Sequence, residues 1–183
     1  MNFLEKIAHC IFVWHIRPST DEELKKADVI ISHAASDYAD GRPGKINEYL
    51  ASIVLALHEK TGLPVIAQGE VALCLISKVP LYGKIPCQRE LPQGDYLDSV
   101  GVAQMQKKIC NENGWKHPIL VTCRPHMLRA LLVSEKAGMD VLIADVPKAV
   151  YDWRVRHWWM RNWWLNNLRE LPCRIVWLLQ GKI

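Results

Sequence analysis

The residues with the clearest chemical potential lie in one stretch, residues 118–130, which reads PILVTCRPHMLRA. Within it, Arg124, His126 and Arg129 fall in the first turn of a predicted helix, where backbone N–H groups have no acceptor inside the helix. Cationic side chains there oppose the helix dipole unless an anion is bound. The stretch therefore predicts a clamp for a phosphate or carboxylate, in which His126 can also exchange a proton. The alternative is an ordinary helix start at the surface.

Carboxylates in other segments can complete an acid–base set with this cationic turn. Glu70 follows a predicted strand and is a candidate general base, and Glu90 is a candidate acceptor for a ligand hydroxyl. Asp37 follows another predicted strand and is a further candidate for ligand binding. Each of these carboxylates has a second interpretation, as a solvated charge or as the partner of an arginine. His126 and Glu70 are the catalytic candidates, although the sequence leaves open whether any reaction is catalysed.

Cys123 offers a different chemistry, because five residues separate it from Arg129. A thiolate stabilised by the helix start would be a nucleophile for phosphoryl hydrolysis. However, Pro125, Met127 and Leu128 stand where a phosphate-binding loop needs small residues, so a buried and inert thiol is the competing interpretation.

The surrounding elements are predicted from hydrophobic periodicity. The apolar residues 119–122 predict a buried strand that runs into a helix near Pro125, whose φ suits a first helical position. Further strands are expected near residues 28–32, 65–67 and 141–145, each separated by amphipathic helices. This alternation predicts an α/β fold with a mostly parallel sheet that is covered on both faces, and such sheets bind ligands at the carboxyl ends of their strands.

Composition and charge limit the domain organisation and the kinds of ligand that we expect. A chain of 183 residues, half of them hydrophobic, suits a single α/β domain over residues 1–183. A loop-rich excursion is expected over residues 70–91, in which residues 71–76 could be either the first turns of a helix or more strand, and the sequence does not fix the structure of residues 71–97. Residues 1–150 hold 17 Lys/Arg against 17 Asp/Glu, so a broad basic surface for nucleic acid is not predicted. The six cysteines lack metal-ligand spacing, so no metal site is predicted, and we expect free thiols in a cytoplasmic protein without a membrane span. No dinucleotide or P-loop glycine motif occurs, and the sequence names no cofactor.

In the predicted strands and helices around residues 118–130, the chain resembles the bacterial family typified by YdcF, SanA and ElyC. The resemblance covers about residues 27–145 and is carried by Val121, Thr122, His126, Met127, Arg129 and Ala130, by Gly69 beside Glu70, and by Glu90 and Ser99 before the next helix. Two segments depart from the family pattern, His33-Ala34-Ala35 and residues 100–104. The resemblance implies a three-layer Rossmann-like sandwich that binds a small anionic or nucleotide-like ligand, with S-adenosylmethionine among the candidates, and a link to the cell envelope. The ligand-binding candidates are then Asp37, Gly69, Glu70, Glu90, Ser99, Thr122, Arg124, His126 and Arg129.

The C-terminal segment, residues 151–183, differs in character from the rest of the chain. It holds six of the eight tryptophans and six Lys/Arg against two Asp/Glu. Three interpretations remain open for this predicted Trp-rich helix: packing onto the sheet or onto another subunit of a homo-oligomer, docking at a membrane surface through residues 151–177, and stacking on nucleic acid. A protein that acts mainly through this tail is the rival to a ligand-binding protein.

Overall fold

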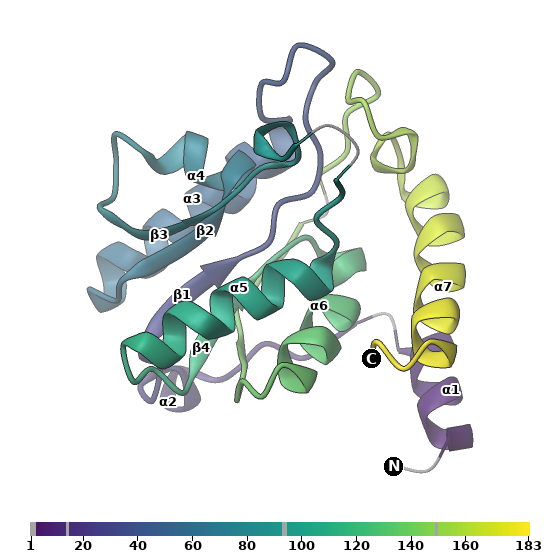
Figure 1. Ribbon diagram of the computed structural model, residues 1–183, viewed down its shortest axis with the longest axis horizontal. Helices are drawn as coiled ribbons and strands as arrows, with labels where there is room; N and C mark the ends of the chain where they lie inside the picture. Colours follow the sequence, from purple (N-terminus) through teal and green to yellow (C-terminus); the bar gives the residue numbers. More distant parts are fainter. Residues whose placement is uncertain (1–2, 14, 93–94, 149) are drawn as a thin grey trace.

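The protein is built around one parallel sheet. The computed structural model describes residues 3–13, 15–92, 95–148 and 150–183. Its five strands lie in the order β3-β2-β1-β4-β5 (Figure 1). Their bounds are β1 (Val29–Ser32), β2 (Val65–Gln68), β3 (Leu81–Ile85), β4 (Pro118–Val121) and β5 (Leu142–Ile143).

Helices cover both faces of the sheet. The crossovers α3 (Lys45–Thr61) and α4 (Gly69–Leu75) pack together on one face, and α5 (Ser99–Glu112) and α6 (Arg124–Lys136) pack on the other (Figure 1). The chain is therefore a three-layer, Rossmann-like α/β sandwich, as the periodicity and the resemblance predicted. Short helices complete the chain: α2 (Asp21–Leu24), η1 (Gln88–Glu90) and η2 (Trp158–Met160).

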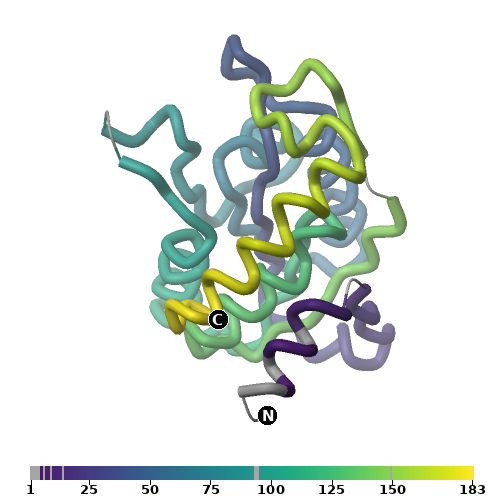
Figure 2. The backbone as a smooth tube through the Cα atoms, turned by 90° about the vertical axis from the view of Figure 1, so that its right-hand side faces the viewer, coloured from purple at the N-terminus to yellow at the C-terminus, as the bar shows by residue number. Residues whose placement is uncertain are grey.

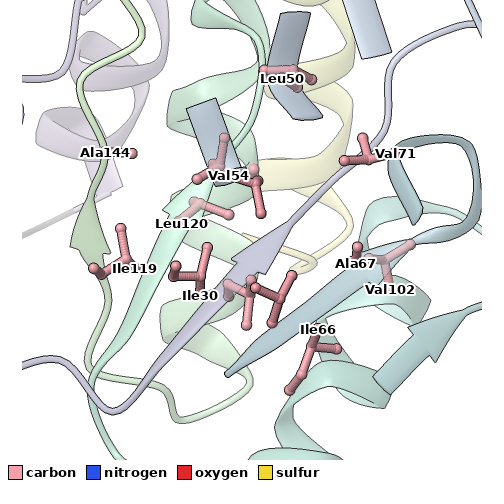
Figure 3. Packing of buried hydrophobic residues seen from close by; sticks show 14 of the residues in the cluster. Ile30, Leu50, Val54, Ile66, Ala67, Val71, Val102, Ile119, Leu120 and Ala144 are labelled. Carbon is pink, nitrogen blue, oxygen red and sulfur yellow. The ribbon is translucent and has the colours of Figure 1, made fainter. Parts of the chain in front are cut away.

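The core lies where the central strands meet the helices. Every residue of β1 and β4 is buried, and Ile30 pairs with Ile119 across the two strands. Leu50 and Val54 of α3 pack over them without solvent exposure (Figure 3). Strands buried on both faces read as continuous apolar runs, which is why the sequence predicted them well.

Helices α5 and α3 have ordinary capping residues, and α6 begins slightly earlier than predicted. Asp98 caps α5 by accepting a hydrogen bond from the N–H of Gly101 at 2.9 Å, and Gly62 ends α3 with φ of 70°. Helix α6 begins at Arg124, one residue before the predicted start, so that Pro125 is its second residue.

The expectation of a loop-rich segment over residues 70–91 was wrong for residues 81–85, and of the two alternatives for residues 71–76 the helix is the one that forms. Val71, Ala72 and Leu75 form the buried side of α4, and residues 81–85 form the edge strand β3. Pro80 and Pro86 flank this strand instead of interrupting it, and on an edge strand a missing N–H costs little. The pattern was obscure because β3 is buried on only part of its surface.

Two further helices lie outside the sandwich. The Trp-containing α7 (Trp163–Leu179) packs against α6, and α1 (Phe3–Phe12) packs against α7, so the first and last helices lie side by side (Figures 1 and 2). Within the described ranges, no helix combines the length and apolar character needed to cross a bilayer.

Candidate functional site

A cavity of about 110 Å³ lies at the carboxyl ends of the strands. Its walls come from residues 33–37 after β1, from the starts of α5 and α6, and from the inner side of α7. Strand order reverses between β1 and β4, and the crevice at such a switch point is where open α/β sheets bind ligands. Figure 2 shows α7 crossing outside α6, so this helix forms the outer wall.

The segment after β1 is held in place by side chains from three other elements. Gln68 Oε1 accepts the N–H of Ala34 at 2.8 Å, and Asn47 Oδ1 accepts the N–H of Ala35 at 2.9 Å. His33 donates from Nε2 to Gln106 Oε1 at 3.0 Å, because an amide oxygen can only accept. The wall of the cavity is therefore braced by α3, β2 and α5.

Five of the predicted site residues meet in this cavity: Asp37, Glu70, Ser99, His126 and Arg129. They come from the ends of β1, β2 and β4 and from the start of α5, which are far apart in the sequence. The prediction that strand ends gather the polar residues at one edge therefore holds for these five positions.

The anion beside Arg129 is a side chain of the protein itself. Glu170 of α7 accepts from Arg129 Nε at 2.7 Å and from Nη2 at 3.2 Å, and both residues are buried. Burial alone would raise the pKa of Glu170, but His126 and Arg129 outweigh it and hold that pKa well below its usual range. The predicted cationic turn is therefore partly neutralised from within the fold.

The carboxylate of Glu170 lies beside three guanidinium groups, those of Arg129, Arg169 and Arg174. Arg169 Nη1 lies 3.3 Å from Glu170 Oε2, and Arg174 Nε lies 3.9 Å from Glu170 Oε1. Arg169 is also stacked on Trp159, and Arg129 on Trp177. Arg129 and Arg169 line the cavity and Arg174 does not, so the α7 side of the cavity carries one formal positive charge more than the carboxylate of Glu170.

His126 and Ser99 form the second polar contact of the cavity. Ser99 Oγ lies 3.2 Å from His126 Nε2 and accepts from Arg129 Nη1 at 3.2 Å. His126 Nδ1 faces Glu170 Oε1 at 3.7 Å, beyond hydrogen-bond distance. Burial and the charge of Arg129 lower the pKa of His126 to about 4, so that this imidazole is neutral at pH 7.

The opposite side of the cavity is acidic. Glu70 Oε2 is buried without a hydrogen-bond partner, and burial raises the pKa of Glu70. Asp37 Oδ1 lies 3.1 Å from Arg156 Nη2 but lacks hydrogen-bond geometry. These oxygens can accept hydrogen bonds from a ligand hydroxyl or ammonium group.

Four predicted site residues do not line the cavity. Arg124 points to the other side of α6, where it donates to Pro147 O and contacts His15. Glu90 pairs with Lys84 and caps η1, and its pKa is lowered to about 2 mainly by Lys84. Thr122 is wholly buried, and Gly69 is required by packing, because a Cβ there would approach Cys87 within 2.5 Å. The sequence places Gly69, Thr122 and Arg124 at strand ends and Glu90 before the next helix, but it does not show which way they point.

Cys123 reaches the cavity but has the character of an inert thiol. It is 3% exposed, and burial raises its pKa to about 11, so almost none is thiolate at pH 7. This environment argues against Cys123 as a nucleophile.

Sequence reasoning missed the contributions of the C-terminal segment. Arg156, His157, Arg169 and Glu170 all line the cavity, whereas the sequence predicted packing, membrane docking or nucleic-acid stacking for the tail and no contribution to the ligand site. One signal was present: Glu170 is the only acidic residue between positions 153 and 183, among five arginines. A lone carboxylate in a basic amphipathic helix indicates a specific internal partner.

Comparisons with known proteins do not add an identity to this geometry. Protein-family models, curated proteins and solved structures give no match to the chain. The assignment to the YdcF/SanA/ElyC-like family therefore stays a prediction based on the residues quoted above. Across the described residues, no group of three His, Cys, Asp or Glu side chains is arranged to hold a metal ion.

Proposed function

We propose that the protein binds a small anionic ligand at the carboxyl ends of its strands, as expected of a divergent YdcF/SanA/ElyC-like protein. The observation that carries this proposal is the excess of positive charge where Arg129 and Arg169 share the single carboxylate of Glu170. A phosphate or carboxylate group of the ligand would face Arg129 and Arg169, which line the cavity. Its hydroxyl or amino groups would face Glu70 and Asp37 on the opposite side.

The size of the cavity favours a compact ligand. Drug-sized ligands occupy pockets of roughly 300–1,000 Å³, and this cavity measures about 110 Å³. A sugar phosphate or a small phosphorylated acid suits it better than a whole nucleotide. S-adenosylmethionine or a nucleotide would enter with only its charged end inside.

Thermal melting with a ligand panel tests this function. The panel contains inorganic phosphate, ribose 5-phosphate, AMP and S-adenosylmethionine, with sodium chloride at matched ionic strength as the control. We expect phosphate and ribose 5-phosphate to raise Tm. At a concentration of 100 times Kd the free energy of unfolding should increase by about 2.7 kcal/mol. Arg169→Gln should abolish the shift, and Lys108→Gln, on the exposed side of α5, should keep it. Unchanged melting with all four compounds would contradict the proposal.

A second candidate function, docking at a membrane surface, is favoured by one face of α7. Trp164, Leu168, Pro172, Val176 and Leu179 are exposed along this face at spacings of three and four residues, with Trp164 75% exposed. Phe12 of the neighbouring α1 is 77% exposed. A helix with an aromatic and aliphatic face and flanking arginines suits the interface of an anionic bilayer.

Flotation with vesicles that contain anionic lipid tests the second function. Leu168→Glu and Arg161→Glu should both weaken binding, whereas Lys108→Glu should leave it intact. Absence of binding by the intact protein would refute it. A stable dimer in sedimentation would instead assign this face to a second copy of the chain.

A further inference from the structure

Ser99, His126 and Glu170 form a chain of contacts with the order of a hydrolase triad. The serine Oγ lies 3.2 Å from His126 Nε2, and His126 Nδ1 faces a carboxylate oxygen of Glu170 at 3.7 Å. The three side chains come from α5, α6 and α7, and all three line the same cavity. Contacts between nucleophile, base and orienting acid are often longer without substrate than in the reacting complex.

The direction of the hydrogen bonds agrees with this order. Arg129 Nη1 can only donate, so at their 3.2 Å contact the oxygen of Ser99 accepts. The hydroxyl hydrogen of Ser99 is then left for His126 Nε2. A neutral imidazole that accepts at Nε2 carries its proton on Nδ1, directed at Glu170.

Arg129 also supplies a hydrogen-bond donor beside the nucleophile, where acyl transfer needs one to stabilise an oxyanion. Its guanidinium lies next to Ser99 Oγ, where negative charge would develop on an attacked carbonyl oxygen. Two further donors come from α5, whose hydrogen-bond ladder begins with the N–H of Val102 to Asp98 O at 3.0 Å. The N–H groups of Ser99 and Val100 precede that bond and need an acceptor from outside the helix.

From these contacts we infer that the protein is a serine hydrolase for small carboxylic esters, with Ser99 as nucleophile, His126 as general base and acid, and Glu170 as the residue that orients His126. This activity goes beyond the proposed anion binding and does not depend on it.

The reaction follows the usual two halves of acyl transfer. Ser99 Oγ bonds to the ester carbonyl carbon while its proton passes to His126 Nε2, and Arg129 stabilises the oxyanion. The bond from the carbonyl carbon to the alcohol oxygen then breaks, and His126 returns the proton to the leaving alcohol. Water next gives a proton to His126 and attacks the acyl-serine. Release of the carboxylic acid regenerates the Ser99 hydroxyl.

The cavity contains a second serine–histidine contact, which lacks the third member. Ser36 Oγ lies 3.0 Å from His157 Nδ1, and Ser36 is 2% exposed. Asp37, the neighbour of Ser36, is paired with Arg156. Among the described residues, no contact joins its carboxylate to Nε2 of His157. Ser99 is the more accessible serine and has both partners.

Covalent labelling of the intact protein with a fluorophosphonate tests the assignment. This uncharged reagent reacts with activated serines, so it needs no knowledge of the natural ester. We expect one adduct by intact mass, located on Ser99 by peptide mapping, and slow hydrolysis of p-nitrophenyl acetate. Ser99→Ala should abolish both signals, and His126→Asn should slow labelling by about 100-fold or more. Ser52→Ala, on the exposed side of α3, is the matched control and should label as the unchanged protein does.

Three outcomes overturn the inference: no adduct on the folded protein, an adduct on Ser36 or elsewhere, or equal labelling of His126→Asn. Each variant is first checked for an unchanged melting profile. Glu170→Gln should also slow labelling. If this variant unfolds, the labelling rate of His126→Asn still tests the inference. Labelling and the phosphate-induced Tm shift are measured separately on the unchanged protein, so failure of the hydrolase inference is distinguishable from failure of anion binding.

Discussion

Glu170 is the residue on which the charge distribution of the site depends. Its side chain is buried beside Arg129, Arg169 and Arg174, of which Arg129 and Arg174 are also buried. Removing one partner of a buried ion pair is more damaging than the pair is stabilising, because the remaining charge is desolvated without compensation. The sequence could not reveal this, since the pairing joins residues 41 positions apart.

Glu170→Gln should therefore lower the free energy of unfolding by about 3 kcal/mol. Urea denaturation followed by tryptophan fluorescence measures the change. Glu59→Gln, at an exposed position on α3, should alter the free energy by less than about 0.5 kcal/mol. Equal stability of the two variants would show that the buried network contributes little.

Glu70 should behave in the opposite way, because its pKa is raised by burial. A carboxyl whose pKa is higher in the folded state loses stabilisation as pH rises above its unfolded value. Glu70→Gln should therefore raise the free energy of unfolding at pH 7 by about 1 kcal/mol, the order of the cost of an unpaired buried polar group. The gain should vanish near pH 4, and a gain that persists there would have a different cause.

At the scale of elements, the predictable parts are those whose burial is periodic. The strands β1, β2 and β4 and the helices α3, α5 and α6 each show an apolar pattern that burial of one or both faces requires. The edge strand β3 alternates in burial, but its sequence signal is weak because Gly83 stands at an inward position and the aromatic Tyr82 at an outward one. Helix α7 was recognised as amphipathic, but its inner face contains Asn166, Glu170 and Arg174, which the sequence presents as surface residues.

Arg174 connects α7 to its two neighbouring helices. It donates to the carbonyl groups of Val13 at 2.8 Å and Cys10 at 3.3 Å beside α1, and to that of Pro125 in α6 at 2.9 Å. Its side chain has no solvent exposure. The docking of both outer helices therefore depends on one guanidinium group.

Arg174→Ala should cost about 2–4 kcal/mol and should loosen α1 before the sheet. Hydrogen–deuterium exchange should show faster exchange in α1 and α7 with little change in β1 and β4. Arg161→Ala, at an exposed position before α7, is the control and should leave exchange in α1 unchanged. Uniform loss of protection across the sheet would contradict the local role.

At the scale of the whole molecule, the site is assembled from segments that the topology brings together. Residues 33–37 and residues 166–177 line one cavity although most of the chain separates them. The position of the candidate site at the carboxyl ends of the strands could be predicted from the parallel sheet, but its place at the switch point follows from the strand order, which hydrophobic periodicity does not give. Its electrostatic content could not, because that depends on where a C-terminal helix lies on the surface of the sandwich.

Two buried histidines make the whole molecule sensitive to acid. Burial lowers the pKa of His33 to about 3 and that of His126 to about 4, with neighbouring charges on His126, Arg129 and Arg169 adding to the effect and Glu170 opposing it at His126. Both are below the unfolded value of about 6.5, so stability falls as pH drops from about 6.5 to 4.

The free energy of unfolding should decrease in that range by about 1.4 kcal/mol per pH unit for each histidine. Urea titrations at several pH values measure this slope, and His126→Gln should reduce it by about half. A slope unaffected by this substitution would assign the acid sensitivity to other groups.

The carboxylate of Glu170 has a further consequence as a tethered competitor. A ligand anion that approaches Arg129 meets a carboxylate already held there by the chain, at an effective concentration far above that of a solute at micromolar levels. The apparent affinity is therefore weaker than the intrinsic affinity of the arginines by the fraction of time that Glu170 vacates its place. Under the proposed binding, selection would follow from this competition, because a ligand with a second contact at Glu70 would displace Glu170 at a lower concentration than inorganic phosphate alone.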